Sequence, residues 1–426
     1  MSEYEITLST HTYGGAALGR LPDGRAVFVP FALPGERVRV SLIEEKRGYA
    51  RARLLEVLEP SPQRISPRCR HFGICGGCHY QHLPYEVQLQ VKETILREQL
   101  QRIGGLENPP LKPIVPSPQP WNYRNHVQFR LDSAGRLAYV SAEGEKTREL
   151  LPIDECHLPE APLNAFWPLL QFEPMPHLER IALRLGEEDT LMLVLESRSP
   201  DPPSLELETS ASVVHLFQDH ALVLAGERYL FRRVRGRLFR ISAGSFFQVN
   251  TAVAEALVEH VLSLLPQRLG EVWDVYCGVG LFSAFLAERA QALKGIEVAA
   301  AACEDFAFNL DEFENVSLYE GLAEEIVPWL AGEPQVILLD PPRAGLALPV
   351  LDALATHQAE HLIYISCDAA TLARDTARLL RQGYILRQVT PFDMFPQTYH
   401  IESVAWFSRP PPPPTRHAPP SRPPAP

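Results

Sequence analysis

The strongest constraint on the fold is the alternation of helix-like and strand-like segments in the C-terminal part of the chain. After residue 250, the helical segment TAVAEALVEHVLSLL is followed by the short apolar run EVWDVY and by a second helical segment, LFSAFLAERA. Further runs, KGIEV, VILLD and LIYIS, continue the pattern. Such alternation predicts a doubly wound α/β sheet, in which ligands bind at the carboxyl ends of the strands. Functional side chains are therefore expected where these runs end.

A glycine-containing loop after the first of these strands predicts a cofactor site. Gly278 and Gly280 make a tight turn between a strand and a helix, so that backbone amides at the helix start face a ligand. Glu297 ends the next strand, where an acidic side chain accepts hydrogen bonds from ribose hydroxyls. Asp340 ends VILLD before two prolines, a position that a simple capping residue also occupies. The loop is not the GxGxxG of dehydrogenases, so the pattern favours a methyltransferase.

The chain of 426 residues is too long for one hydrophobic core, and we expect several domains. Residues 1–58 alternate apolar and polar positions between turn signals, which is typical of a five-strand barrel of the oligonucleotide-binding type. A helix is predicted over residues 86–103, before Gly104. The remaining ranges are a central, mainly β domain at 59–245, the α/β domain at 246–408, and a proline-rich tail at 409–426 that is expected to be disordered.

Four of the seven cysteines form a metal-binding pattern. Cys69, Cys75 and Cys78 have C-x5-C-x2-C spacing in the glycine-containing segment CRHFGICGGC, and Cys156 in DECHLP supplies a distant fourth thiol. Thiols in a reducing compartment more often bind metal or do chemistry than form structural disulfides. The set suits a 4Fe-4S cluster or a four-cysteine zinc site, and the spacing favours iron. Its expected role is structural, because it ties together segments that are far apart in the sequence.

Composition excludes a membrane-spanning chain and a wholly basic nucleic-acid binder. No apolar run approaches the roughly 20 residues needed to cross a bilayer. The N-terminus lacks the basic and apolar regions of a secretion signal, so we expect a cytoplasmic protein, and nothing indicates an obligate protein partner, so we expect a monomer. The net charge is -12, yet residues 228–240 carry six arginines. Such a run is more often a solvated strand face than a binding surface.

Two residues near the C-terminus lie at positions suited to chemistry on a uracil base. Cys367 ends the buried strand LIYIS, near the expected cofactor, and Glu402 opens the last strand pair. Uracil C5 is a weak nucleophile, so its methylation needs a thiolate that adds to C6 and a base that later removes the C5 proton. Each residue taken singly is more often structural, but the pair suffices for this reaction. Cys277 and Cys303 are the competing thiols, and their local sequence favours structural positions.

Together the motifs resemble the RNA 5-methyluridine methyltransferase family, in particular its iron-sulfur branch that modifies 23S ribosomal RNA. The resemblance covers nearly the whole chain and rests on CRHFGICGGCHYQH, YRNHVQFR, SFFQVN, DVYCGVG, LLDPPRAG, ISCDAATLARD and HIES, in the family's order. It implies an N-terminal TRAM barrel that binds RNA, a central iron-sulfur domain and a Rossmann-like class I catalytic domain. It also implies that the helix over 86–103 packs with the catalytic domain.

The resemblance implies a role for each motif residue. It assigns Gln248, Tyr276, Glu297 and Asp340 to S-adenosylmethionine, Cys367 to nucleophilic attack, Glu402 to proton removal, and Cys69, Cys75, Cys78 and Cys156 to a 4Fe-4S cluster. Phe246 and Phe247 would offer an aromatic face to a base drawn out of its RNA stack, with core packing as the alternative for at least one of them.

Two departures from the family's pattern and three alternative functions stay open. Asp368-Ala369 follows Cys367 where the family usually has Asn-Pro, and the added carboxylate would raise the pKa of the thiol unless it is engaged elsewhere. Leu281 replaces an Asn of the ribosomal branch, which leaves one cofactor contact open. The first alternative is methylation of the transfer RNA T-loop uridine. The second is cytosine-5 methylation, which is disfavoured because Glu402 stands where RNA enzymes of that type have a second cysteine. The third is a non-catalytic iron-sulfur RNA-binding protein.

Overall fold

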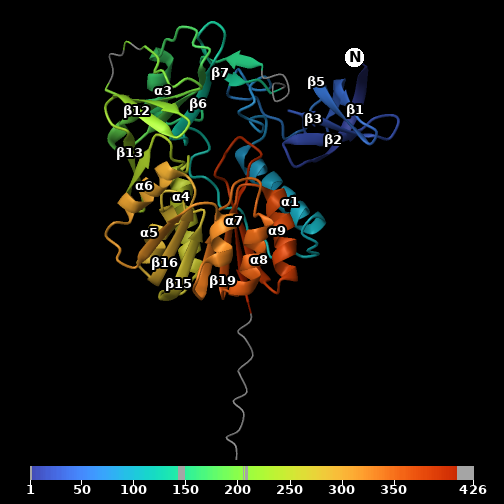
Figure 1. The fold of residues 1–426 in the computed structure, drawn as a ribbon. Helices are drawn as coiled ribbons and strands as arrows, with labels where there is room; N and C mark the ends of the chain where they lie inside the picture. Colours follow the sequence, from blue (N-terminus) through green and yellow to red (C-terminus); the bar gives the residue numbers. More distant parts are fainter. Residues whose placement is uncertain (1, 143–148, 205, 207–209, 410–426) are drawn as a thin grey trace, which may run out of the picture.

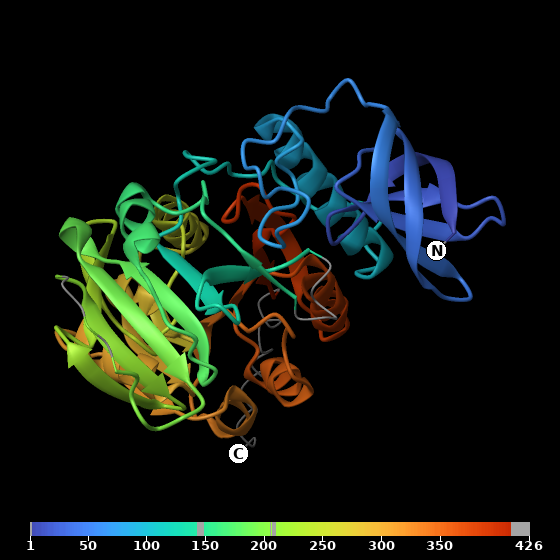
Figure 2. The same ribbon diagram turned by 90° about the horizontal axis from the view of Figure 1, so that it is seen from above.

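The chain forms three bodies arranged around one sheet edge. The structure, a computed structural model, describes residues 2–142, 149–204, 206 and 210–409. The N-terminal barrel and the central β-rich part both lie above the C-terminal α/β part (Figure 1), and a view from above shows the barrel set to one side (Figure 2). Apart from Arg409, the predicted disordered tail lies outside the described residues. Among the helices described, none combines the length and apolar content needed to cross a bilayer.

The five-strand barrel predicted at the N-terminus is confirmed. Its described strands pair in the order β1-β2-β3-β5-β4 and close on themselves. Alternate residues point inward, and Val27, Val29, Val38 and Val40 are fully buried, as the period of two in the sequence requires. The strands are β1 (Glu3–His11), β2 (Ala16–Arg20), β3 (Ala26–Pro30), β4 (Arg37–Glu45) and β5 (Tyr49–Glu59).

The central part is built on a mixed sheet whose described strands have the order β12-β11-β10-β9-β6-β7-β8. Phe129 stacks on Tyr139 with ring centroids 5.1 Å apart, and Trp167 covers the other side of the same core. A hairpin, β13-β14, leads from this sheet into the catalytic part. The strands are β6 (His126–Leu131), β7 (Leu137–Val140), β8 (Leu150–Pro152), β9 (Leu178–Leu185), β10 (Leu191–Ser197), β11 (Ser212–Phe217), β12 (His220–Ala225), β13 (Tyr229–Val234) and β14 (Arg237–Ser242), with helical turns α3 (Ala161–Phe166), η1 (Trp167–Leu169) and η2 (Glu187–Asp189).

The six arginines between residues 228 and 240 are held in ion pairs within the protein. Arg240 bonds to the buried carboxylate of Asp305 at 2.7 Å, and Arg232 bonds to Glu160 at 2.6 Å. The other four pair with Glu304, Glu187, Glu259 and Glu312. These ion pairs connect the hairpin to acidic residues of both the central part and the C-terminal α/β part. The six arginines therefore do not form an unpaired basic surface.

The doubly wound α/β sheet predicted for the C-terminal part is also confirmed. Its described strands have the order β17-β16-β15-β18-β19-β21-β20. The pairs from β17 to β19 are parallel, and β21 runs antiparallel to both β19 and β20. The strand order reverses between β15 and β18. Both faces are buried, one under α7, α8 and α9 and the other under α4, α5 and α6. The elements are α4 (Thr251–Leu264), β15 (Leu269–Val275), α5 (Leu281–Ala287), β16 (Ala290–Glu297), α6 (Ala300–Asn309), β17 (Val316–Glu320), α7 (Ala323–Ile326), η3 (Val327–Trp329), β18 (Pro334–Leu339), α8 (Leu348–His357), β19 (His361–Ser366), α9 (Ala369–Arg381), β20 (Ile385–Phe392) and β21 (Glu402–Ser408).

The early helix α1 (Tyr85–Arg102) lies against α9, far from its neighbours in sequence (Figure 1). Val91, Ile95 and Leu100 enter the same hydrophobic core as the catalytic sheet. At the buried end of this contact, the Lys92 ammonium donates to Asp393 at 2.6 Å and to the carbonyl of Phe395 at 3.1 Å, and neither charged side chain is exposed. A buried ion pair contributes mainly by fixing one arrangement, because desolvation offsets much of its attraction.

Candidate active site

Five residues singled out in the sequence meet at one edge of the catalytic sheet. In the parallel pairing, Val275 of β15 aligns with Ile296 of β16 and with Leu339 of β18. Tyr276, Glu297 and Asp340 occupy the next position on each strand, so all three stand at the carboxyl edge. Cys367 follows β19 at the same edge. Because β21 runs antiparallel to β19, with Ser366 opposite Ser403, Glu402 lies beside Cys367.

The glycine loop after β15 has a backbone that suits a bound ligand. Gly280 has a φ of 88°, and a Cβ at this position would lie 2.4 Å from Cδ1 of Leu310. Gly278 also has a positive φ, of 54°, and its amide donates to Oε2 of Glu297 at 2.9 Å. The other oxygen of Glu297 accepts from the amides of Val298 and Ala299, both at 2.8 Å. The carboxylate is thus held rigidly at the end of β16, where a ribose would be recognised.

Two further groups stand at this edge in buried surroundings. The hydroxyl of Tyr276 is buried and has no partner in the described residues, and Tyr276 itself has a positive φ of 68°. Burial, with smaller contributions from the charges of Asp274 and Glu297, raises the pKa of Asp340 to about 7. A buried polar group without a partner, as at Tyr276, indicates a place that a polar ligand fills. The arrangement fits S-adenosylmethionine.

Gln248 reaches this region from the segment before α4. Its side chain is buried, and its carbonyl accepts from Nδ2 of Asn125 at 3.0 Å. Phe246 and Phe247 precede it and diverge: Phe246 is 69% exposed, whereas Phe247 packs toward Phe239 with centroids 6.0 Å apart. Core packing therefore accounts for Phe247, and Phe246 presents a free aromatic face.

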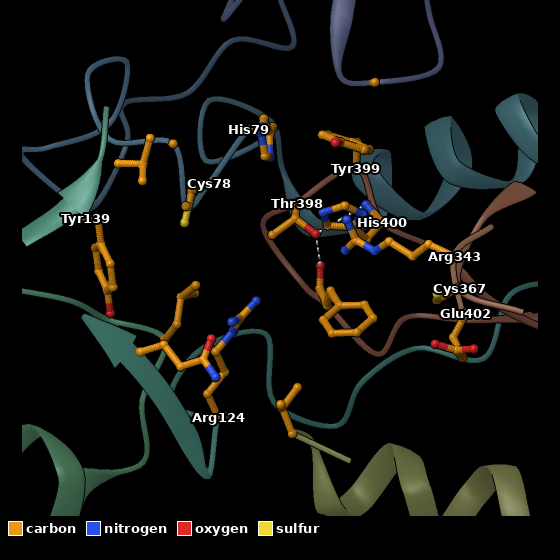
Figure 3. Close-up of a pocket in the computed structure, with 18 of the residues that line it drawn as sticks. Cys78, His79, Arg124, Tyr139, Arg343, Cys367, Thr398, Tyr399, His400 and Glu402 are labelled. Atoms are coloured by element: carbon orange, nitrogen blue, oxygen red, sulfur yellow. Dashed lines mark hydrogen bonds between the residues drawn. The ribbon is translucent and has the colours of Figure 1, made fainter. Parts of the chain in front are cut away.

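The side chains of Cys367 and Glu402 lie close together, and both have raised pKa values (Figure 3). Burial raises the pKa of the Cys367 thiol to about 12, and the neighbouring carboxylate of Glu402 contributes in the same direction. Burial also holds the pKa of Glu402 well above its usual range, and Asp340 adds to this effect. Arg343 opposes both shifts, since its positive charge favours the ionised forms. In Figure 3 the Arg343 side chain starts close to Cys367 and extends toward His400.

Asp368, which follows Cys367, has both carboxylate oxygens in hydrogen bonds. Its Oδ1 caps α9 by accepting from the amides of Ala370 at 3.0 Å and Thr371 at 2.9 Å. Its Oδ2 accepts a hydrogen bond from the hydroxyl of Tyr13, which belongs to the barrel. Its charge still raises the pKa of Cys367, although burial, Glu402 and Asp340 contribute more.

One cavity of about 2310 Å³ contains both the residues of the sheet edge and the four cysteines of the predicted metal site. Its lining includes Gln248, Tyr276, Glu297, Asp340, Cys367 and Glu402, together with Cys69, Cys75, Cys78 and Cys156. Leu281 lines it at the start of α5 with a buried side chain, and so offers only apolar contact where an Asn would offer hydrogen bonds. Arg51 and Arg53 of the barrel line the other end. The cavity is therefore large enough for a polynucleotide segment and a cofactor together.

Four thiols gather at the far side of this cavity. Cys69, Cys75, Cys78 and Cys156 line it together. Burial raises the pKa of Cys69, Cys75 and Cys78, and the nearby Cys156 contributes to each shift in the same direction. The loop crosses β7, where the amide of Gly76 donates to the carbonyl of Val140 at 3.1 Å. Apolar side chains surround the thiols: Phe72, Trp121, Tyr123 and Leu158. Within the described residues, no group of three or more His, Cys, Asp or Glu side chains has the arrangement of a metal-ion site.

Four residues that line this cavity received no role from the sequence. Arg343 stands in the LLDPPRAG motif, and a cation shortly after an acidic strand end was a usable signal. Tyr399 and His400 directly precede the IES motif, with ring centroids 4.3 Å apart. No local pattern pointed to the contact of Tyr13 with Asp368, since the two are 355 residues apart.

The fold and the site define an α/β methyltransferase with an N-terminal barrel, and comparisons with known proteins agree. Residues 1–55 match the TRAM domain, and residues 227–410 match the family described as tRNA (Uracil-5-)-methyltransferase. A protein of Thermosynechococcus vestitus named as an RNA methyltransferase is 34% identical over 435 residues, which is 94% of this chain and 97% of that protein. One of Streptomyces coelicolor, also named as an RNA methyltransferase, is 34% identical over 430 residues, or 95% of this chain and 92% of its own length.

The chain belongs to the RNA uracil-5-methyltransferase family. It is an enzyme, and the predicted TRAM barrel is confirmed. The fold is similar to the crystal structure of Pyrococcus abyssi tRNA (uracil-54, C5)-methyltransferase in complex with S-adenosyl-L-homocysteine. The TM-score is 0.72 with 24% sequence identity, over 94% of this chain and 99% of that one.

The two glycines of the cofactor loop allow a paired test of its geometry. Gly280→Ala is expected to lower stability by about 1 to 3 kcal/mol and to weaken cofactor binding, because its Cβ would meet Leu310 and Phe306. Gly278→Ala, also at positive φ but with nothing within 4 Å of its Cβ, is expected to cost only about 1 kcal/mol. Thermal melting with and without S-adenosylhomocysteine measures both effects. Equal losses in the two variants would contradict this account of the loop.

Proposed function

We propose that this enzyme methylates C5 of a uridine in RNA, with Cys367 as the nucleophile and Glu402 as the base. The observation that carries the proposal is the placement of this thiol and this carboxyl side by side at the sheet edge, next to Asp340. Gln248, Tyr276, Glu297 and Asp340 bind S-adenosylmethionine. When bound, this cofactor supplies the methyl group.

Cys367 activates the base by addition. Its thiolate attacks C6 of uracil, and the electron pair of the C5=C6 bond moves toward O4 as an enolate, which makes C5 nucleophilic. The thiol is protonated at rest because burial raises its pKa to about 12, so the reaction depends on groups that favour the thiolate. Arg343 is such a group, since its charge lowers the pKa of Cys367. The protonated resting state also protects the cysteine from unwanted reactions.

Glu402 completes the reaction. After C5 has gained the methyl group, the carboxylate removes the C5 proton, the enolate re-forms, and its collapse expels the Cys367 thiolate and restores the C5=C6 bond. Burial raises the pKa of Glu402 well above its usual range, so the carboxylate is a stronger base than an exposed one and the protonated product is stable in place. The side chain is only 4% exposed, which keeps water from competing for the proton.

Substitution of the two reacting residues separates the two steps. Cys367→Ala is expected to abolish methyl transfer from labelled S-adenosylmethionine to RNA, by about a thousandfold or more. Glu402→Gln is expected to form the adduct and to release it about 100-fold to 10,000-fold more slowly, so that a covalent protein-RNA species accumulates on denaturing gels. Cys303→Ser, at a buried thiol of α6, is the matched control and retains turnover. Normal turnover in the Cys367 variant would refute the mechanism.

The substrate we favour is 23S ribosomal RNA. The support is the combination of a TRAM barrel with four gathered cysteines, which resembles the ribosomal branch. The alternative is the T-loop uridine of transfer RNA, because the P. abyssi protein of similar fold is named for that activity.

Mapping of 5-methyluridine in total RNA distinguishes the two substrates. A strain that lacks this gene is expected to lose the modification from 23S ribosomal RNA, while transfer RNA keeps it. Return of the wild-type gene restores the modification, whereas the Cys367→Ala gene, as the matched control, does not. Loss confined to transfer RNA would overturn the assignment to ribosomal RNA. If neither RNA lost 5-methyluridine, the proposal that this protein methylates uridine in either of them would be wrong.

We further propose that Cys69, Cys75, Cys78 and Cys156 hold a 4Fe-4S cluster. Apolar side chains pack around Cys78 and Cys156, as a buried inorganic cluster requires. The C-x5-C-x2-C spacing with a single distant fourth thiol favours this cluster over a four-cysteine zinc site. The cluster would tie the loop before α1 to the segment between β8 and α3 that contains Cys156.

Anaerobic purification tests the cluster. The protein is expected to be brown, with broad visible absorbance and about four irons per chain. Cys78→Ser is expected to lose most of the iron and the colour, because Cys78 is the most buried of the four thiols. Cys303→Ser, which removes a thiol outside the group, keeps both. A colourless anaerobic preparation with stoichiometric zinc would show that the assignment is wrong.

A further inference from the structure

The turn that joins β1 to β2 of the barrel reaches the edge of the catalytic sheet. The ring of Tyr13, in this turn, meets the ring of Tyr399 edge-on with centroids 6.4 Å apart. Gly15 follows with a φ of 85°, and a Cβ there would lie 3.0 Å from Cδ1 of Tyr399 and 3.3 Å from Cβ of His79. The turn approaches so closely only because it has glycine at this point. Tyr13 therefore belongs to the wall of the active-site cavity.

The hydroxyl of Tyr13 donates to Oδ2 of Asp368, the residue directly after the nucleophile. Oδ1 of the same carboxylate is already used by the amides of Ala370 and Thr371 at the start of α9. The carboxylate is therefore fixed from two sides, by the helix that it caps and by the barrel. Burial raises the pKa of Tyr13, so its hydroxyl stays protonated and remains a donor at the pH of the reaction.

The position of Asp368 also determines the backbone around Cys367. The hydroxyl of Ser366 donates to the carbonyl of Asp368 at 3.0 Å, which closes a tight bend over the cysteine. The amide of Asp368 lies 3.3 Å from the same hydroxyl oxygen. A shift of the Asp368 carboxylate is therefore transmitted to the Cys367 backbone through this bend.

We propose that Tyr13 is a positioning residue of the reaction, through which the barrel fixes Asp368 and thereby orients the Cys367 thiol. The inference rests on the proposed role of Cys367 as the nucleophile. It gives the barrel a second task besides binding RNA, because a barrel side chain completes the active site. A misplaced nucleophile slows attack even when every reacting group is present.

The chemistry of the pair explains why an aspartate serves at this position. A carboxylate accepts hydrogen bonds only, and the tyrosine hydroxyl and the helix amides are directed to it. The charges that face Cys367 come from Glu402, Asp340, Arg343 and Asp368. Donors on both oxygens hold the Asp368 carboxylate in one position.

Tyr13→Phe tests the proposal, with Tyr4→Phe as the matched control. Tyr4 lies in β1 of the same barrel and packs against the barrel core. The readout is the single-turnover rate of covalent adduct formation with RNA that contains 5-fluorouridine, in the presence of S-adenosylmethionine. Tyr13→Phe is expected to slow this rate about tenfold, as loss of a hydrogen bond to a charged group does, with unchanged RNA affinity and melting temperature. Tyr4→Phe leaves the rate unchanged.

A double-mutant cycle shows whether Tyr13 acts through Asp368. Asp368→Ser keeps a capping side chain for α9 but is too short to reach the tyrosine. In this background Tyr13→Phe is expected to have no further effect on the rate. Equal tenfold losses in both backgrounds, or weaker RNA binding with an unchanged rate, would overturn the positioning role. No adduct with the wild-type protein would instead refute the nucleophilic role of Cys367, so the two failures are distinguishable.

Discussion

The common carboxyl edge of the parallel strands is the constraint on which the rest of the structure depends. Parallel pairing in register brings Tyr276, Glu297 and Asp340 to one line, although 64 residues separate the first from the last. The strand order reverses between β15 and β18, which opens a crevice at this line for a ligand. The antiparallel insertion of β21 beside β19 then adds Glu402 to the same edge as Cys367. The direction and pairing of the strands alone thus bring these residues together at one edge.

The other two bodies are held over this edge by specific polar contacts. Lys92 of α1 reaches into the catalytic core and bonds to Asp393, and the arginines of the β13-β14 hairpin bind Asp305 and its neighbours. Such contacts contribute less to stability than the apolar cores do, because each buried charge first loses its hydration. Their main effect is on the relative orientation of the three bodies. A buried charge without its partner raises the free energy of the folded protein, so the arrangement in which every pair forms is favoured. The barrel, joined through Tyr13, is part of that arrangement.

The sequence sufficed for features that depend on local pattern. The period of two in residues 4–57 predicted the barrel, and the strand-helix alternation predicted the sheet and the positions of Asp340 and Cys367 at its edge. It failed where the partner of a residue is distant in sequence. The arginines of 228–240 showed a basic run but not the acids that neutralise them, and Asp368 showed an added charge but not the tyrosine that binds it. Charge along a chain is local, whereas charge in a fold depends on contacts that only the tertiary structure supplies.

The accumulation of acids at the edge has a direct electrostatic consequence. Burial raises the pKa of Asp274, Asp340 and Glu402, and neighbouring carboxylates add to each shift: Glu297 acts on Asp274 and Asp340, and Asp340 acts on Glu402. A site of this kind favours a cationic ligand, because a positive charge stabilises carboxylates that otherwise repel each other in a medium of low dielectric constant. The sulfonium of S-adenosylmethionine carries such a charge, and the thioether left after methyl transfer does not. On the proposed function, these acids therefore hold the methyl donor more strongly than its product, and the electrostatics of the edge assist turnover.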